Sequence, residues 1–338
     1  PFQDSLRQSI QLISSAEQAI YLNSYGSLDT QLGHLFAEVS LSLLKKAGVS
    51  PSEVTAIGSH GQTVCHAPES ASAFSLQIGD PNIIAEITGI TTIADFRRRD
   101  IAAGGQGAPL VPAFHQAVFS DFFDFSKQNI SIVNIGGVAN ITHLSSNKTI
   151  GFDTGTGNML MDYWIQKHQG CAYDKNGDWA KSGNANQELV ENLKQDPYFK
   201  LSLPKSTGKE YFSPNWLNEK ISQSPNCNNR DIQASLCQFT AETITEAITK
   251  HAPLTNYTLI CGGGMHNKHL IELIQNDLDH PVLSTSEFGI NPDHVEAMAF
   301  AWLARQTIHN LSGNLIEVTG AKNPVILGGI YPGSKGLY

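Results

Sequence analysis

The spacing of apolar residues predicts a helical start to the chain. Leu6, Ile10 and Ile13 recur at intervals of four and three, and a second amphipathic run covers residues 32–46. Such intervals place side chains on one face of an α-helix. We therefore expect two helices before the first strand.

Short apolar runs and helix signals alternate over the next part of the chain. Asp80 can cap a helix N-terminus, and Pro81 suits the first helical position because its missing N–H is not needed there. The expected elements are strands at 54–61, 73–80 and 91–96, helices at 81–88 and 111–119, and a glycine-rich loop at 104–109.

The pattern resets near residue 127. The run ISIVNIGGVANITHL reads as a strand, a Gly-Gly turn and a returning strand, which predicts a hairpin. The polar residues 172–230 are expected to form an insertion or long loops between helices. The elements expected after them are a helix at 231–250, a strand at 257–264, and helices from 267 and from 293 to 309.

A chain of 338 residues is long enough for two domains. We expect an N-terminal lobe at 1–127 and a C-terminal lobe at 128–312. The tail, 313–338, is rich in Gly and Pro, and the pattern leaves its placement uncertain.

Composition and charge narrow the class of protein. The 22 basic and 31 acidic residues give a net charge of −9, which argues against a sequence-independent nucleic-acid binder. No run of about 18 apolar residues predicts a membrane span, and the N-terminus does not resemble a signal peptide. The five Cys include no CxxC pair, which favours reduced thiols in a cytoplasmic protein.

Two glycine-rich turns are candidates for ligand binding. Asn134–Gly137 lies between two expected strands, and Cys261–Asn267 joins a strand to a helix. Bare backbone in such turns can approach a phosphate or a flat purine. An ordinary hairpin turn and an ordinary strand–helix junction are the alternatives. The segment Ser206–Lys209 lacks the flanking residues of a P-loop and is rejected as one.

Two carboxylates are candidates for chemistry. Asp153 follows the hairpin, and we expect it at the end of a strand before a Gly-Thr-Gly turn, where it could act as a general base, bind a metal or merely cap a turn. Glu296 lies in the first turn of an apolar helix, where complementing the helix dipole is the simpler explanation. The run DFRRRDIAAGGQGAP could hold a polar ligand or be a solvated charge run. The histidines offer no zinc motif.

The order of the motifs resembles the actin/sugar-kinase/Hsp70 superfamily, and several blocks resemble the anhydro-N-acetylmuramic acid kinase family more closely. These blocks are GSHGQTVCHAP, LQIGDPNIIAEITGITTIADFRRRDIAAGGQGAPLVPAFH, NIGGVANIT, GFDTGTGNMLMDYW, DWAKSGN, STGKEYFSPNWL, CGGGMHN and NPDHVEAMAFAWLA.

The resemblance implies an α/β fold of two actin-like (ribonuclease H-like) lobes, each with a mixed sheet flanked by helices, and a cleft between them. It also implies an ATP- and Mg²⁺-dependent enzyme. Water opens the anhydro bridge of 1,6-anhydro-N-acetylmuramic acid and O6 is phosphorylated, in peptidoglycan recycling. A cytoplasmic homodimer is expected, with sugar and ATP as partners and neither nucleic acid nor membrane.

The resemblance also implies site residues, although it leaves the metal ligands unknown. Asp153 would be the general base, and Glu296 would orient water or sugar. The remaining expected residues are, for the sugar, His60, Gln62, Arg97, Asp100 and Gln106, and for the nucleotide, Gly136, Gly137, Asn140, Gly155, Gly262, Gly263 and Gly264.

One family feature does not occur in the sequence. Family members begin with a strand and a GTSxDG phosphate loop, and we expect that this part precedes Pro1 in the natural protein. A chain beginning at Pro1 would then be nearly inactive. Two alternative functions stay open: a kinase of the same fold acting on another sugar, and a nucleotide- or sugar-binding protein without turnover.

Overall fold

The computed structural model describes residues 4–14, 22–146, 148–203, 205–223 and 227–334, and two compact units make up the chain. Unit 1 combines Pro1–Phe114 with Ala297–Tyr338, and unit 2 is His115–Glu296. The chain therefore divides at other positions than the expected 127 and 312. The tail, whose placement the sequence leaves uncertain, belongs to unit 1.

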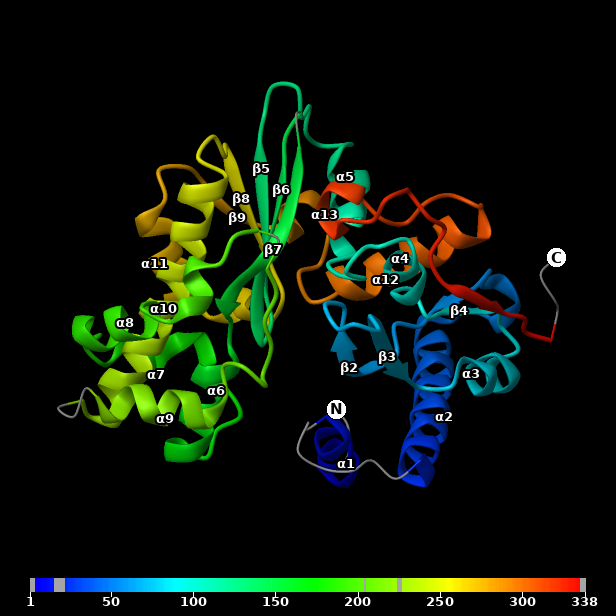
Figure 1. Ribbon diagram of the computed structural model, residues 1–338, viewed down its shortest axis with the longest axis horizontal. Helices are drawn as coiled ribbons and strands as arrows, with labels where there is room; N and C mark the ends of the chain where they lie inside the picture. Colours follow the sequence, from blue (N-terminus) through cyan, green and yellow to red (C-terminus); the bar gives the residue numbers. More distant parts are fainter. Residues whose placement is uncertain (1–3, 15–21, 147, 204, 224–226, 335–338) are drawn as a thin grey trace. The chain divides into compact units, whose positions relative to one another are not determined.

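A five-stranded mixed sheet forms the centre of unit 2 (Figure 1). Its strands, in the order β7-β6-β5-β8-β9, are β5 (Ile130–Ile135), β6 (Val138–Leu144), β7 (Thr149–Thr156), β8 (Tyr257–Cys261) and β9 (Val282–Ser284). The first three strands are antiparallel, whereas β5, β8 and β9 run parallel. The predicted hairpin is confirmed as β5 and β6.

Unit 2 also contains the helices α6 (Met159–Gln169), α7 (Asp178–Lys181), α8 (Gln187–Lys194), α9 (Pro214–Ser222), α10 (Asn229–His251) and α11 (Lys268–Asp277). On one side of this sheet, α10 and α11 contact its strands, and further helices pack against α10 and α6. Side chains from the sheet and from α10, such as Ile135, Ile260 and Phe239, are fully buried in one apolar core. The predicted mixed sheet flanked by helices is confirmed.

The expected loop region 172–230 contains three of these helices. The helices α7, α8 and α9 are short, and each buries only a few apolar side chains, as α8 does with Leu189, Val190 and Leu193. Polar residues dominate the rest of each helix. The polar composition therefore predicted loops. In the structure, N-cap residues such as Asn186 and Ser213 begin helices in this region.

The helix α5 (Val111–Phe119), predicted with these bounds, begins in unit 1 and ends in unit 2. In unit 2, its residue His115 shares a hydrogen bond of 2.9 Å with Thr142 of β6. Phe119 and Phe123 pack with Tyr257 and Phe288 through tilted and edge contacts. These contacts cover part of the second face of the sheet.

Unit 1 holds two small sheets and several helices. Its elements are α1 (Asp4–Ser14), α2 (Leu22–Ala47), β1 (Ile57–Gly58), β2 (Gln62–Ala67), β3 (Phe74–Ile78), α3 (Pro81–Thr88), β4 (Thr92–Ala94), α4 (Arg98–Ala102), most of α12 (Val295–Ile308), α13 (Ile316–Thr319) and β10 (Gly329–Tyr331). The sheet orders are β1-β4-β10 and β2-β3. In the tail, β10 pairs antiparallel with β4.

Local signals in unit 1 were partly correct. The helix α3 begins where predicted, and the Asp80 side chain accepts a hydrogen bond from the Asn82 N–H. The expected strand at 54–61 was wrong in extent, because only Ile57 and Gly58 pair with β4. The segment after it, for which no strand was expected, forms β2, since it has β3 as an antiparallel partner.

All five cysteines are free. Within the described part of the chain, no helix has the length and apolarity needed to cross a bilayer.

Two buried threonines in the sheet of unit 2 differ in hydrogen bonding. Thr142 is bonded to buried His115, whereas the hydroxyl of Thr156 has no hydrogen-bond partner among the described residues. We expect T142V to lower the free energy of unfolding by about 1–3 kcal/mol, because a buried hydrogen bond is lost. T156V should be neutral or stabilising. Urea unfolding of both variants measures this, and equal destabilisation would contradict the assigned hydrogen bonding.

Candidate functional site

Strand register in unit 2 places a row of polar residues across the sheet. Asp153 of β7 pairs with Asn140 of β6, Asn140 pairs with Asn134 of β5, and Asn134 pairs with Cys261 of β8. Paired residues on neighbouring strands share one face of a sheet. The Cys261 thiol lies 3.8 Å from Asn134 Oδ1, in agreement with this register. The row therefore joins the predicted base to the glycine-rich turn after β8.

The strand β7 carries Asp153 differently from the sequence expectation. Asp153 lies within β7, not at its end, and Gly155 and Thr156 continue the strand. Ala139 of β6 pairs with Gly155, whereas the next residue, Asn140, pairs with Asp153. Thr154 is therefore an extra residue in β7 and makes a bulge beside Asp153. Bulges re-aim the side chains next to them. The Gly-Thr-Gly sequence thus marks a distorted strand and not a turn.

Hydrogen bonds to residues 198–207 hold Asp153. Its N–H donates to the carbonyl of Lys205 at 3.1 Å, and its carbonyl accepts the Tyr198 hydroxyl at 2.6 Å. The Thr207 N–H donates to its carboxylate Oδ2 at 3.0 Å. Because both backbone and side chain are bonded, the half-buried carboxylate has a fixed direction.

The segment Lys205–Lys209 was missed as part of the site. From the sequence, Ser206–Lys209 was rejected as a P-loop and counted within a block that resembles the family, but no site residue was assigned to it. Its backbone instead lies beside Asp153, some fifty positions earlier in the chain. Burial, and next the charge of Lys250, lower the pKa of Lys205, and its ammonium lies 4.4 Å from the centre of the Tyr198 ring. No local sequence signal predicts this pairing.

The two glycine-rich turns meet at the ends of β5 and β8. A Cβ at Gly262 would lie 2.5 Å from Asn134 Oδ1, and one at Gly264 would lie 2.3 Å from the Ile135 side chain. Gly157 packs equally closely on the carbonyl of Gly136. The N–H groups of Asn158 and Met159, where α6 begins, donate to carbonyls of the Gly136–Gly137 turn. Close packing therefore explains the glycines at 157, 262 and 264.

Three other glycines are not required by the fold. Added Cβ atoms at Gly136, Gly137 and Gly263 would have no neighbour closer than 3.6, 3.8 and 3.9 Å. None of the three has a φ in the left-handed region. Neither packing nor backbone conformation therefore demands glycine, and the three positions leave backbone accessible to a ligand.

Gly155 belongs with the packing glycines. Its φ is 149°, which side chains rarely adopt, and a Cβ there would lie 3.0 Å from the Phe199 ring. Its expected nucleotide contact stays a prediction. Asn140, in the polar row, is half-buried.

Glu296 lies in the first turn of α12, as predicted, and is exposed. Burial, and next the charge of Glu296, raise the pKa of Cys261. Glu296 is thus near the β8 end of the polar row. Asp153 is at the other end, three strand spacings or about 14 Å away along the row. The two carboxylates therefore lie toward opposite ends of the row.

In unit 1, Arg97 and His60 form a polar pair. The Arg97 guanidinium donates to His60 Nε2 at 3.1 and 2.9 Å and to the carbonyl of Gly107 at 2.8 Å. Burial, and next the charge of Arg97, lower the pKa of His60 to about 3. The imidazole is therefore neutral and accepts from the guanidinium. The structure thus brings together two residues that the sequence predicted for the sugar site.

Asp100, which is expected to contact the sugar, is hydrogen-bonded within unit 1. It is fully buried, and its carboxylate accepts hydrogen bonds from the Gly107 N–H, the Asn314 amide and the Thr319 hydroxyl at 2.7–2.8 Å. A Cβ at Gly105 would lie 2.3 Å from the same carboxylate. Asp100 thus holds the 104–107 loop, and its expected sugar contact stays a prediction.

Gln62 is the first residue of β2, and Gln106 lies in the 104–107 loop. Both residues are half-buried. The Gln62 amide donates to the carbonyl of Thr63, and the Gln106 N–H donates to the carbonyl of Thr319. The side chain of Gln106 is therefore carried on backbone that Asp100 and Thr319 hold.

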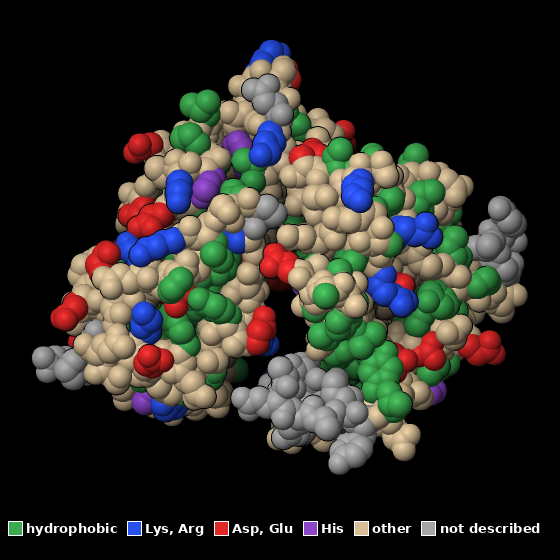
Figure 2. Space-filling model, viewed as in Figure 1, with side chains coloured by type: hydrophobic (Ala, Val, Ile, Leu, Met, Phe, Trp, Pro, Cys, Tyr) green, Lys and Arg blue, Asp and Glu red, His purple; other side chains and the backbone are tan. Residues whose placement is uncertain are grey.

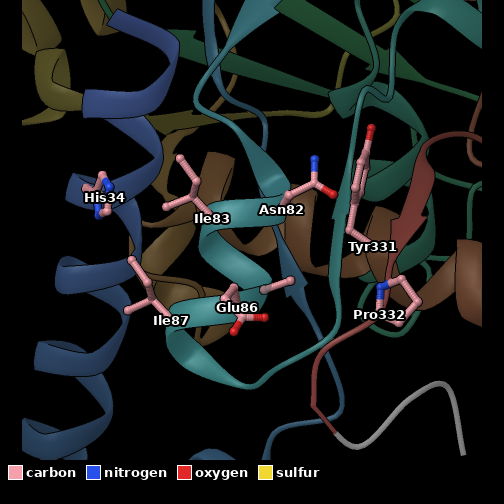
Figure 3. A pocket seen from close by; sticks show the side chains of 8 residues that line it. His34, Asn82, Ile83, Glu86, Ile87, Tyr331 and Pro332 are labelled. Atoms are coloured by element: carbon pink, nitrogen blue, oxygen red, sulfur yellow. The ribbon is translucent and has the colours of Figure 1, made fainter. Parts of the chain in front are cut away.

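Among the residues that the structure describes, no group of three or more His, Cys, Asp or Glu could hold a metal ion. A pocket of about 460 Å³ lies in unit 1 between α2, α3 and the end of β10 (Figure 3). Its lining includes His34, Glu86 and Tyr331, but none of the predicted site residues.

Comparisons with known proteins identify the family of the chain. The family model "Anhydro-N-acetylmuramic acid kinase" matches residues 1–333. Relatives with this name include those of Photobacterium profundum (51% identical, 99% of this chain and 90% of the relative), Pasteurella multocida (47%, 99% and 88%) and Coxiella burnetii (48%, 93% and 84%).

A solved structure with some likeness is the activator of the 2-hydroxyisocaproyl-CoA dehydratase from Clostridium difficile with bound ADPNP. It has a TM-score of 0.35 and 13% identity over 64% of this chain and 70% of that chain.

Fold and site together define an α/β protein with a mixed sheet. A carboxylate on the edge strand β7 and open glycine turns at the ends of β5 and β8 belong to this sheet. Within that class, the chain belongs to the anhydro-N-acetylmuramic acid kinase family. The family predicted from the sequence motifs is thereby confirmed.

The depressed pKa of His60 predicts an acid-sensitive stability. Between pH 6.5 and about 3, the unfolded chain binds a proton at this residue and the folded chain does not, so stability falls as the pH falls. In H60Q, whose amide oxygen can still accept from Arg97, this fall should be shallower. Urea midpoints at pH 7 and pH 5 measure it. A variant as acid-sensitive as the wild type would show that His60 is not buried in its neutral form.

Proposed function

We propose that the protein is an ATP-dependent kinase that hydrolytically opens 1,6-anhydro-N-acetylmuramic acid and phosphorylates O6, giving N-acetylmuramic acid 6-phosphate for peptidoglycan recycling. Family membership supports this reaction. The structural observation that carries it is the fixed Asp153 carboxylate in one row with the open glycine turns of the same sheet.

The chemistry requires a base and a phosphoryl donor. Water attacks the anomeric carbon, the bond from that carbon to O6 breaks, and O6 takes the γ-phosphoryl group as ADP leaves. Asp153 accepts the proton that water loses. An aspartate is a weak base, so its contribution depends on position, and the Thr207 N–H supplies that position. The products are the sugar phosphate, ADP and one proton.

Residues of unit 1 are proposed to bind the sugar. Arg97 presents a guanidinium that is oriented by neutral His60, a geometry suited to a carboxylate such as the lactyl group of muramic acid. Gln62 and Gln106 offer amides. Asp100 acts indirectly, because it holds the loop that carries Gln106. The cleft between the lobes stays a prediction.

The nucleotide is proposed to lie along the glycine turns. Gly136, Gly137 and Gly263 leave room for phosphate or purine, and the α6 N-terminus adds a positive dipole end. Asn140 and Glu296 flank this region, and Glu296 stays the second candidate for a catalytic carboxylate.

Mg²⁺ would be held mainly by the phosphates of the nucleotide, since the described residues offer no preformed cluster of ligands. When bound, the ion neutralises phosphate charge. A cytoplasmic homodimer without nucleic-acid or membrane partners is proposed from the family resemblance and the acidic net charge.

Asp153→Asn tests the assignment of the base. Asparagine keeps the shape but cannot take the proton, so we expect turnover to fall about 10²–10⁴-fold while sugar binding is retained. Single-turnover product formation and sugar titration measure the two effects. Asp121→Asn, an exposed carboxylate beyond α5, is the matched control. Ring opening by D153N at the wild-type rate would remove Asp153 as base, and loss in E296Q would then assign Glu296.

Gly263→Val tests the nucleotide site. The added side chain meets open space, so the fold should persist while the Kd for ATP rises about tenfold or more. Gly264→Val is the contrast, because its Cβ would overlap Ile135 and should destabilise unit 2. Calorimetric titration and thermal unfolding separate the outcomes. Unchanged ATP affinity in folded G263V would exclude this turn as the nucleotide site.

A further inference from the structure

Lys209 places a positive charge beside the open turn between β5 and β6. Its Cε lies 4.0 Å from the position that a Cβ on Gly137 would take. The ammonium is one bond further along the side chain. The lysine thus runs past the glycine turn that the fold itself does not require.

Lys209 has no ion-pair partner among the described residues, and the residue is exposed. Lys194 of the same unit, by contrast, binds three glutamates. Lys205, at the start of the same segment, lies on the Tyr198 ring and donates to the Tyr198 carbonyl.

The backbone that carries Lys209 is well held. The N–H groups of Tyr211 and Phe212 both donate to the carbonyl of Gly208, which closes a turn around Lys209. Phe212 is buried among Tyr198, Phe199 and Trp216. The lysine therefore extends from a fixed anchor and not from a loose loop.

We propose that Lys209 binds a terminal phosphate of the nucleotide over the Gly136–Gly137 turn. This inference rests on the proposed function. Three features favour an anion there: open glycine backbone, the N-terminus of α6, and an ammonium without an internal partner. A lysine acts on phosphate as a point charge with three donors, so it needs no P-loop around it.

The proposal gives the Lys205–Lys209 segment two functions. Thr207 orients the general base through its N–H, and Lys209, two residues later, neutralises the phosphoryl group that the freed O6 must attack. The base and the phosphate are thereby linked by one short segment.

The test compares K209M, K209R and the matched control K148M by calorimetric titration with ATP, ADP and AMP at fixed Mg²⁺. Lys148 is exposed on the β6–β7 connection, at the opposite end of β6 from Gly137. K209M should weaken ATP and ADP binding about tenfold to hundredfold and leave AMP binding within twofold. K209R should recover part of the loss, and K148M should match the wild type.

The outcomes are separable. Wild-type affinity for ATP in K209M, or an equal loss for AMP, overturns the assignment of Lys209. Failure of the wild type to bind ATP overturns the proposed function instead. Because Lys209 is exposed, thermal unfolding of K209M should match the wild type, and a lowered midpoint would assign the effect to the fold.

Discussion

The register of four neighbouring strands is the constraint on which the candidate site depends. It places Asp153, Asn140, Asn134 and Cys261 in one row on one face of the sheet. A slip of one residue in any pairing would turn the next side chain of the row to the opposite face, into the apolar core under α10. The buried residues on that face, such as Ile135 and Ile260, therefore fix the geometry of the polar row as well as the stability of the sheet.

The glycines at the ends of β5 and β8 are of two kinds, which differ in the space around them. Gly262 and Gly264 let the turn after β8 contact β5 backbone and side chains, so a larger residue would separate the strands. Gly136, Gly137 and Gly263 have space around them, so close packing does not explain why these positions are glycine. The sequence alone cannot distinguish the two kinds, because it does not show how close the neighbouring atoms lie.

The features of the fold and site that could be predicted are those whose signals lie within a short stretch of the sequence. Local signals succeeded: Asp80 and Pro81 fixed the start of α3, and the Gly-Gly hairpin gave β5 and β6. Motif resemblance identified the family and the candidate site residues together. Long-range pairing could not be read, because β2 exists only through its partner β3. The contact of Asp153 with Thr207 likewise joins segments that have no common local pattern.

Asp100 and Asp153 show why burial and hydrogen bonding, and not sequence context, decide what a carboxylate does. Both stand close to glycine-rich sequence, and the motifs alone suggested ligand contact for each. Asp100 is fully buried and its carboxylate accepts hydrogen bonds from three donors, so solvent does not reach the residue in this structure. Asp153 is half-buried on a bulged strand, where one backbone donor sets its direction while solvent still reaches the residue. A general base must exchange its proton in every cycle, and only the second environment permits that exchange without unfolding a loop.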